Sequence, residues 1–261
     1  MRFWLNFAVF ASSLNLVFAQ GGGQFVSYLQ TANVKNEQLA EEKLGSLIAK
    51  LGEKERKSDR QFLRSVFNLT HRQVLKQYDQ YATFGELFES GRYDCLTATA
   101  LYSVVLSKLG YAHSVIETNY HIFLLINSDE GQILMESTDP IGGFEYNQER
   151  ITNRIEQYKK DAAVVLANQA ASGYLLFNEV SMDELKGLLY YNQCVKAFNN
   201  QQWMEAIKNL DLASRYYYSE RIQEMENLLM NVIASAKLEN AKESDEVSTT
   251  RFQVAQRYQQ P

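Results

Sequence analysis

Length, composition and charge limit what this chain can be. Its 261 residues are 46% hydrophobic, which is enough apolar material for one large domain or two smaller ones. The formal net charge is −5, and the 26 lysines and arginines are spread along the chain without a basic run, which argues against a nucleic-acid partner.

The first 19 residues are typical of a secretory signal peptide. Arg2 supplies a positive charge, residues 3–18 are mostly apolar, and Val17-Phe18-Ala19 ends on the small residue that a cleavage site needs. Polar residues interrupt the apolar stretch, so a permanent membrane anchor is the weaker interpretation. The sequence therefore predicts a secreted or periplasmic protein that has no membrane span after cleavage of residues 1–19.

The N-terminal part of the mature chain, residues 20–80, is predicted to form helices. Residues 36–51 carry leucine and isoleucine side chains at helical spacing, and Gly52 ends this pattern. A second helix can begin at Ser58-Asp59 and run to about residue 78, because aliphatic and aromatic residues form a continuous stripe along it.

Residues 81–146 are predicted to form the core of an α+β fold. Asp94 is a good N-cap for a helix that ends at Gly110, and the apolar residues of this helix lie on nearly all of its sides. Such a helix is usually buried in the centre of a domain. Three short segments rich in β-branched and aliphatic residues follow, and they predict a small antiparallel sheet packed on the helix. These segments are residues 112–118, 121–127 and 132–136.

Helices are expected again in the C-terminal part of the chain. Residues 147–181 are assigned to a connecting segment, and residues 182–238 to three helices. The first two, at 182–199 and 203–217, place bulky and small residues where a tetratricopeptide repeat has them, so this part resembles one such repeat with a third, covering helix. The polar tail, residues 239–261, is expected to be disordered.

Cys95, His121 and Glu136 are the candidate catalytic residues. A neutral thiol is a poor nucleophile, but the N–H groups and the dipole at a helix start favour the thiolate. His121 and Glu136 lie on neighbouring predicted strands joined by a tight turn, so they can be cross-strand neighbours. The imidazole would take the thiol proton, and the carboxylate would orient the imidazole. Asp94 opposes this, because its charge raises the thiol pKa unless capping turns it away.

Together these residues resemble the transglutaminase-like superfamily, which is related to papain-type cysteine peptidases. The resemblance covers about residues 85–143, and it rests on Gly91-Arg92-Tyr93-Asp94-Cys95, then His121, then Met135-Glu136-Ser137-Thr138. It implies that Cys95 is the nucleophile, His121 the base and Glu136 the orienting acid, with Asp139 as an alternative acid.

The resemblance also implies a reaction. Members of this superfamily carry out acyl transfer on amides, which for this chain means peptide hydrolysis, deamidation or crosslinking of glutamine side chains. The substrate would be a protein or a peptide, and no cofactor would be needed. The backbone N–H of Cys95 is the candidate for stabilising the oxyanion.

Other roles are open for some of these residues. Cys95 and Cys194 can form a disulfide in an exported protein, or Cys194 can be a small buried residue between two helices. His71 and His113 are expected to be structural or exposed. Three histidines and two cysteines without close paired spacing do not predict a metal site.

The alternative function is a binding module of the cell envelope. In that case the protein keeps a transglutaminase-like fold without the activity, and the C-terminal helices bind a protein partner. The single helical repeat and departures from the superfamily's pattern around His121 favour this alternative. Glu136 stands where aspartate is commoner, and His121 is followed by Ile122-Phe123 rather than by a small residue and tryptophan.

Overall fold

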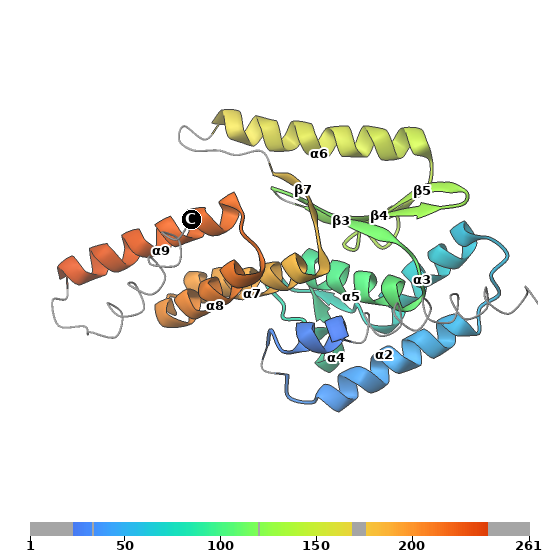
Figure 1. Cartoon of the computed structure of the whole chain (residues 1–261), viewed down its shortest axis with the longest axis horizontal. Helices are drawn as coiled ribbons and strands as arrows, with labels where there is room; N and C mark the ends of the chain where they lie inside the picture. Colours follow the sequence, from blue (N-terminus) through green and yellow to red (C-terminus); the bar gives the residue numbers. More distant parts are fainter. Residues whose placement is uncertain (1–22, 33, 120, 169–175, 240–261) are drawn as a thin grey trace, which may run out of the picture. The chain divides into compact units, whose positions relative to one another are not determined.

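The structure is a computed structural model that describes residues 23–32, 34–119, 121–168 and 176–239 (Figure 1). The predicted signal peptide and residues 240–261 of the predicted tail lie outside the described residues. The chain divides into two compact units, Met1–Leu185 and Lys186–Pro261. Helices and an antiparallel sheet occur together in the described part, which confirms the predicted α+β class.

Two helices near the N-terminus pack on each other as the sequence predicts. They are α2 (Glu37–Gly52) and α3 (Asp59–Gln73). The Ser58 hydroxyl caps α3 by accepting a hydrogen bond from the N–H of Gln61. Helix α2 buries alanine and leucine side chains, and α3 buries leucine, phenylalanine and valine side chains together with Thr70 and His71 near its end.

Helix α3 ends earlier than the sequence suggests. The sequence pattern places its end near residue 78, but the helix stops at Gln73. The backbone then turns so that β1 (Gln77–Tyr78) pairs in parallel with β2 (Arg92–Tyr93). Gly91 accepts the first hydrogen bonds of this pair at its carbonyl, and its φ of 77° is one that glycine adopts readily. A short helix, α4 (Glu86–Glu89), lies between the two strands in the chain.

Helix α5 (Cys95–Lys108) is the central helix of the first unit. Asp94 accepts a hydrogen bond from the N–H of Thr97 at 2.8 Å, and the Thr97 hydroxyl accepts one from the N–H of Asp94 at 2.9 Å, which makes a complete capping box. All residues from Leu96 to Leu106 are buried, so the prediction of a buried helix is confirmed.

A five-stranded antiparallel sheet packs on α5, in the order β6-β5-β4-β3-β7. Its first three strands in the chain lie close to the predicted segments, and β4 and β5 form a hairpin in which Leu124 faces Met135. The strands are β3 (His113–Thr118), β4 (Ile122–Ser128), β5 (Gly131–Met135), β6 (Phe144–Glu145) and β7 (Phe177–Val180).

Residues 147–181 are more than the connecting segment that the sequence suggests. They contain α6 (Gln148–Asn168) and the strand β7, which extends the sheet beside β3. Helix α6 lies on the face of the sheet opposite to α5, so the sheet has a helix on each face (Figure 1). The buried residues of this second layer are Ile116, Phe123, Leu134 and Ile151, with Leu125, Ile155, Tyr158 and Phe177 packed against them.

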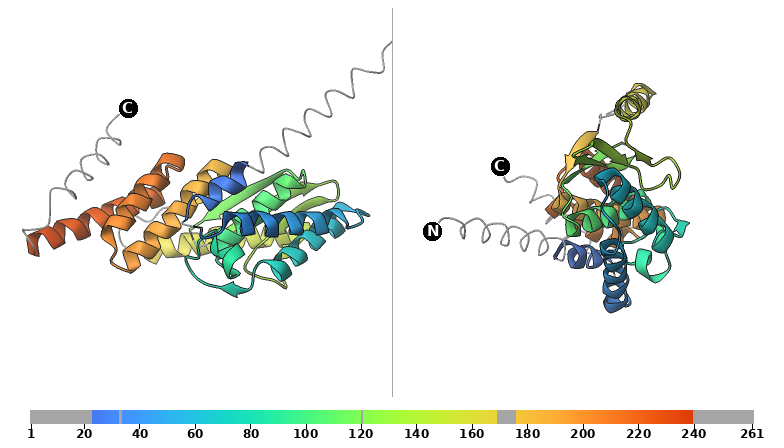
Figure 2. Two further views of the ribbon diagram at one scale, coloured as in Figure 1. Left: turned by 90° about the horizontal axis from the view of Figure 1, so that it is seen from below. Right: turned by 90° about the vertical axis from the view of Figure 1, so that its right-hand side faces the viewer.

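The described part of the second unit is helical. It contains most of α7 (Met182–Asn199), all of α8 (Trp203–Tyr216) and α9 (Glu220–Glu239), and these ranges agree closely with the predicted helices (Figure 2). Gly187 allows α7 to approach α8 closely, because a Cβ there would lie 3.0 Å from the carbonyl oxygen of Ala213.

Candidate functional site

Cys95 is the first residue of α5 and lies directly after the N-cap. Its side chain is partly exposed, and both Cys95 and Cys194 are free thiols. The Asp94 carboxylate accepts hydrogen bonds from both the N–H and the hydroxyl of Thr97, each at 2.8 Å. Capping therefore draws this carboxylate into the first turn of the helix. A reactive thiol at Cys95 needs this arrangement, because a carboxylate directed at the thiol would raise its pKa.

His121 and Glu136 form a pair at one end of the sheet. His121 lies directly before β4 and Glu136 directly after β5, so the β4–β5 hairpin brings them together. The distance from Nδ1 of His121 to Oε1 of Glu136 is 3.8 Å, which is within ion-pair range and too long for a direct hydrogen bond. The side chains are 40% and 14% exposed, so the imidazole is accessible and the carboxylate is mostly covered.

Two buried hydroxyls connect the start of α5 to the backbone beside this pair. The Ser137 hydroxyl donates to the carbonyl of Cys95 at 3.2 Å and lies 3.1 Å from the Thr99 hydroxyl. Thr99 donates to the carbonyl of Ile122 at 3.4 Å. Ile122 and Ser137 each follow a member of the pair in the chain. All three predicted residues therefore belong to one hydrogen-bonded end of the sheet.

Cys95 and the His121–Glu136 pair belong to opposite faces of the sheet. Phe123 and Leu134 face α6, and side chains two residues apart on a strand point to the same side. This alternation places His121 and Glu136 on the α6 side, whereas Cys95 belongs to α5, the helix on the other face. The hydrogen bonds of Ser137 and Thr99 join the start of α5 to the sheet at the end where β4 begins.

Helix α6 supplies two side chains to this site that the sequence analysis did not identify. The Tyr158 hydroxyl donates to Oε2 of Glu136 at 2.5 Å, and its ring centroid lies 5.2 Å from that of His121. Nη1 of Arg154 lies 3.7 Å from the same Oε2 and donates to the carbonyl of Gly142 at 3.2 Å. Burial and the hydrogen bond to Glu136 raise the pKa of the Tyr158 hydroxyl, so it stays protonated and acts as a donor.

Asp139, the alternative acid, shapes the loop that follows β5. Its Oδ1 accepts hydrogen bonds from the N–H groups of Ile141 at 3.1 Å and Gly142 at 2.8 Å. A Cβ at Gly143 would lie 2.2 Å from the carbonyl oxygen of Glu136, so this loop folds tightly against the backbone of that residue. Of the two acids, Glu136 is the one that the structure pairs with His121.

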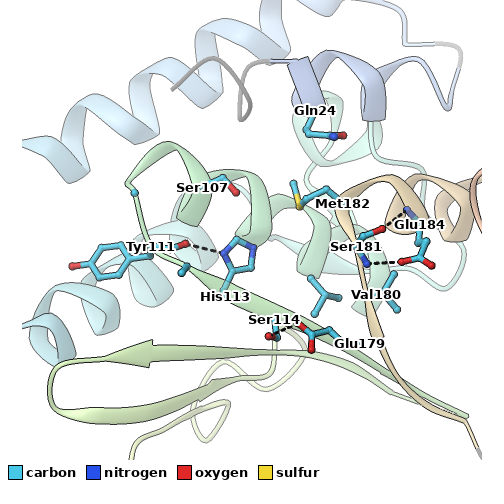
Figure 3. Close-up of a pocket in the computed structure, with 13 residues that line it drawn as sticks. Gln24, Ser107, Tyr111, His113, Ser114, Glu179, Val180, Ser181, Met182 and Glu184 are labelled. Carbon is cyan, nitrogen blue, oxygen red and sulfur yellow. Dashed lines mark hydrogen bonds between the residues drawn. The ribbon is translucent and has the colours of Figure 1, made fainter. Parts of the chain in front are cut away.

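A cavity of about 680 Å³ lies near the other end of α5, and His113 forms part of its wall (Figure 3). Nδ1 of His113 lies 3.0 Å from the carbonyl of Tyr111, and Nε2 lies 2.6 Å from the Ser103 hydroxyl. Nδ1 donates to the carbonyl, and in the neutral ring that burial favours Nε2 is an acceptor for the Ser103 hydroxyl, which also lies 2.8 Å from Sδ of Met182. Burial lowers the pKa of His113.

His71, in α3, lies among aromatic rings, and burial lowers its pKa as well.

The comparisons with known proteins add no further assignment. Comparison of the chain with protein-family models, curated proteins and solved structures finds no match. None of the helices in the described ranges has the length and apolar composition needed to cross a bilayer. Within the same ranges, no three His, Cys, Asp or Glu side chains are grouped so that they could hold a metal ion.

Proposed function

We propose that the protein is a cysteine enzyme that acts on amide bonds. Cys95 is the nucleophile, His121 the base and Glu136 the acid that orients it. The observation that carries this proposal is the His121–Glu136 pair, located where the start of α5 is hydrogen-bonded to the sheet. The resemblance of residues 85–143 to the transglutaminase-like superfamily supports the same three roles.

In the proposed reaction the Cys95 thiol gives its proton to His121 and attacks the carbonyl carbon of the amide. The tetrahedral intermediate then breaks its carbon–nitrogen bond, and His121 returns the proton to the leaving amine. The acyl group remains on Cys95 as a thioester. Attack by water completes hydrolysis or deamidation, and attack by a second amine completes crosslinking. Each path returns the thiol to its starting state.

Two further features support this assignment. The partly exposed position of Cys95 at a helix start is typical of reactive rather than structural cysteines. The predicted signal peptide supports a role in the periplasm or outside the cell, with a protein or peptide as the substrate.

The test is the pH dependence of iodoacetamide labelling at Cys95 in the natural protein and in His121→Ala. We expect labelling to continue well below pH 8.5, about the pKa of a free thiol, and to fall about 10-fold at pH 6 without His121. Cys194 is the internal control, because its side chain is fully buried and burial raises its pKa to about 12. An ordinary thiol profile at Cys95 in the natural protein would overturn the proposal.

The second candidate is a binding module that uses the helices of the second unit. Its motivation is the exposure of large apolar side chains on α8, on α9 and between them, with Tyr218 66% exposed and Met204 and Leu228 46% exposed each. The labelling experiment separates the two candidates, because a binding module does not need a reactive thiol. The resemblance to a tetratricopeptide repeat supports a protein or peptide as its partner.

A further inference from the structure

We infer that Tyr158 is a positioning residue of the proposed active site, which fixes the Glu136 carboxylate so that one of its oxygens faces His121. This inference rests on the proposed function, because it assigns a role within the same site. It extends the site to α6, a helix outside the segment that resembles the transglutaminase-like superfamily.

The two oxygens of Glu136 have different partners. Oε1 faces Nδ1 of His121 and accepts a long hydrogen bond, 3.5 Å, from the Thr138 hydroxyl, whereas Oε2 receives the short hydrogen bond of Tyr158 and lies 3.7 Å from Arg154. A carboxylate is planar and rigid, so a donor that holds Oε2 also determines where Oε1 points. At 2.5 Å the Tyr158 bond has the length expected of a hydroxyl that donates to a charged oxygen.

The ring of Tyr158 restricts the imidazole as well. Its centroid lies 5.2 Å from the ring centroids of both His121 and Phe123, with an angle of 40° between the ring planes in each case. The ring therefore fills the space between the imidazole and the apolar layer under α6. A single side chain contacts both members of the pair, one through its hydroxyl and the other through its ring.

Arg154 acts on the same carboxylate in a different way. It also donates to the carbonyl of Gly142, so the loop that follows Glu136 is attached to α6. At 3.7 Å from Oε2 it provides no close hydrogen bond that would fix the direction of the oxygens. The directional contact at Oε2 comes from Tyr158.

The experiment compares Tyr158→Phe with Tyr111→Phe. Tyr111 is a matched control, because its hydroxyl also donates to a carboxylate, Oδ1 of Asp59, at 2.7 Å, and its ring also packs on a neighbouring aromatic ring. Each variant removes one hydroxyl and keeps the ring. Thermal unfolding shows whether both variants fold.

Two readouts are needed, the rate of Cys95 alkylation against pH and the ¹⁵N chemical shifts of the His121 ring. In Tyr158→Phe we expect alkylation near pH 6 to slow about 10-fold, the typical effect of losing a hydrogen bond to a charged group. We also expect the Nδ1-protonated form of neutral His121 to become less populated. Tyr111→Phe should change neither readout.

The outcomes separate this inference from the proposed function. If Cys95 is reactive in the natural protein and Tyr158→Phe matches Tyr111→Phe in both readouts, the inference is wrong and the proposed function stands. If Cys95 behaves as an ordinary thiol in the natural protein, the proposed function fails. In that case the ¹⁵N shifts still decide whether Tyr158 positions Glu136 against His121.

Discussion

A histidine lies near each end of α5, and the two histidines have opposite environments. His121, near the start of the helix, is 40% exposed and paired with a carboxylate. His113, near the other end, is bonded to the hydroxyl of Ser103 and the carbonyl of Tyr111, both neutral groups. The first environment leaves the imidazole exposed beside a carboxylate, whereas the second lowers the pKa of His113 because burial penalises charge. Exposure and partners, rather than residue type, therefore distinguish the candidate catalytic histidine from the structural one.

Removing the partner of His113 should have the largest effect on stability. In Ser103→Ala the buried Nε2 loses its donor, which should lower the free energy of unfolding by about 1–3 kcal/mol. Ser107→Ala on the same helix is the control, because Ser107 is only partly buried. Chemical unfolding measures the loss, and iodoacetamide labelling of Cys95 should remain at its natural rate. A slower rate in Ser103→Ala would contradict a purely structural role for the His113 end.

His113 should contribute to the pH dependence of stability, together with His71, whose pKa burial also lowers. Burial lowers the pKa of His113 in the folded protein below the unfolded value of about 6.5, so the unfolded chain binds more protons in this window. Stability should therefore fall as the pH drops from about 6.5 through the folded pKa, by at most about 1.4 kcal/mol per pH unit for one proton. Urea unfolding at several pH values, with His113→Gln as the comparison, tests this, because the variant should show a shallower slope.

The His121–Glu136 pair should matter least for stability. Glu136→Gln should change the free energy of unfolding by less than about 1 kcal/mol, because partly exposed ion pairs contribute little and the amide oxygen can still accept from Tyr158. Its effect should appear instead in Cys95 labelling below neutral pH, which should slow. A large loss of stability without any change in labelling would reverse the roles assigned to the two ends of α5.

The first part of the site could be predicted because its contacts are local in the chain. A hairpin with a tight turn places the residue before one strand near the residue after the next, so His121 and Glu136 follow from the strand pattern alone. The position of Cys95 follows from an N-cap residue ahead of a continuous apolar run, which is also why the bounds of α5 agree with the prediction.

The second part of the site was missed because α6 was missed. Only a narrow stripe of α6 faces the sheet, with Ile151, Ile155 and Tyr158 separated by four and three residues, and polar and charged residues dominate the rest of its described side chains. Residues 148–160 therefore read as a polar segment. The contact of Tyr158 with Glu136 joins residues 22 positions apart on different elements, and no local pattern encodes such a contact.

The position of β7 in the chain determines when the sheet can be completed during synthesis. It covers the free edge of β3, and it lies beyond α6 in the sequence, so this edge stays open until residue 180 has been synthesised. A fragment that stops before Phe177 would present unpaired backbone N–H and carbonyl groups along β3, which is a template for strand pairing between chains. In the complete fold the edge strand on this side of the sheet is β7, which has four residues and carries the exposed, charged side chain of Glu179. Self-association is thus expected of nascent or shortened chains rather than of the finished fold.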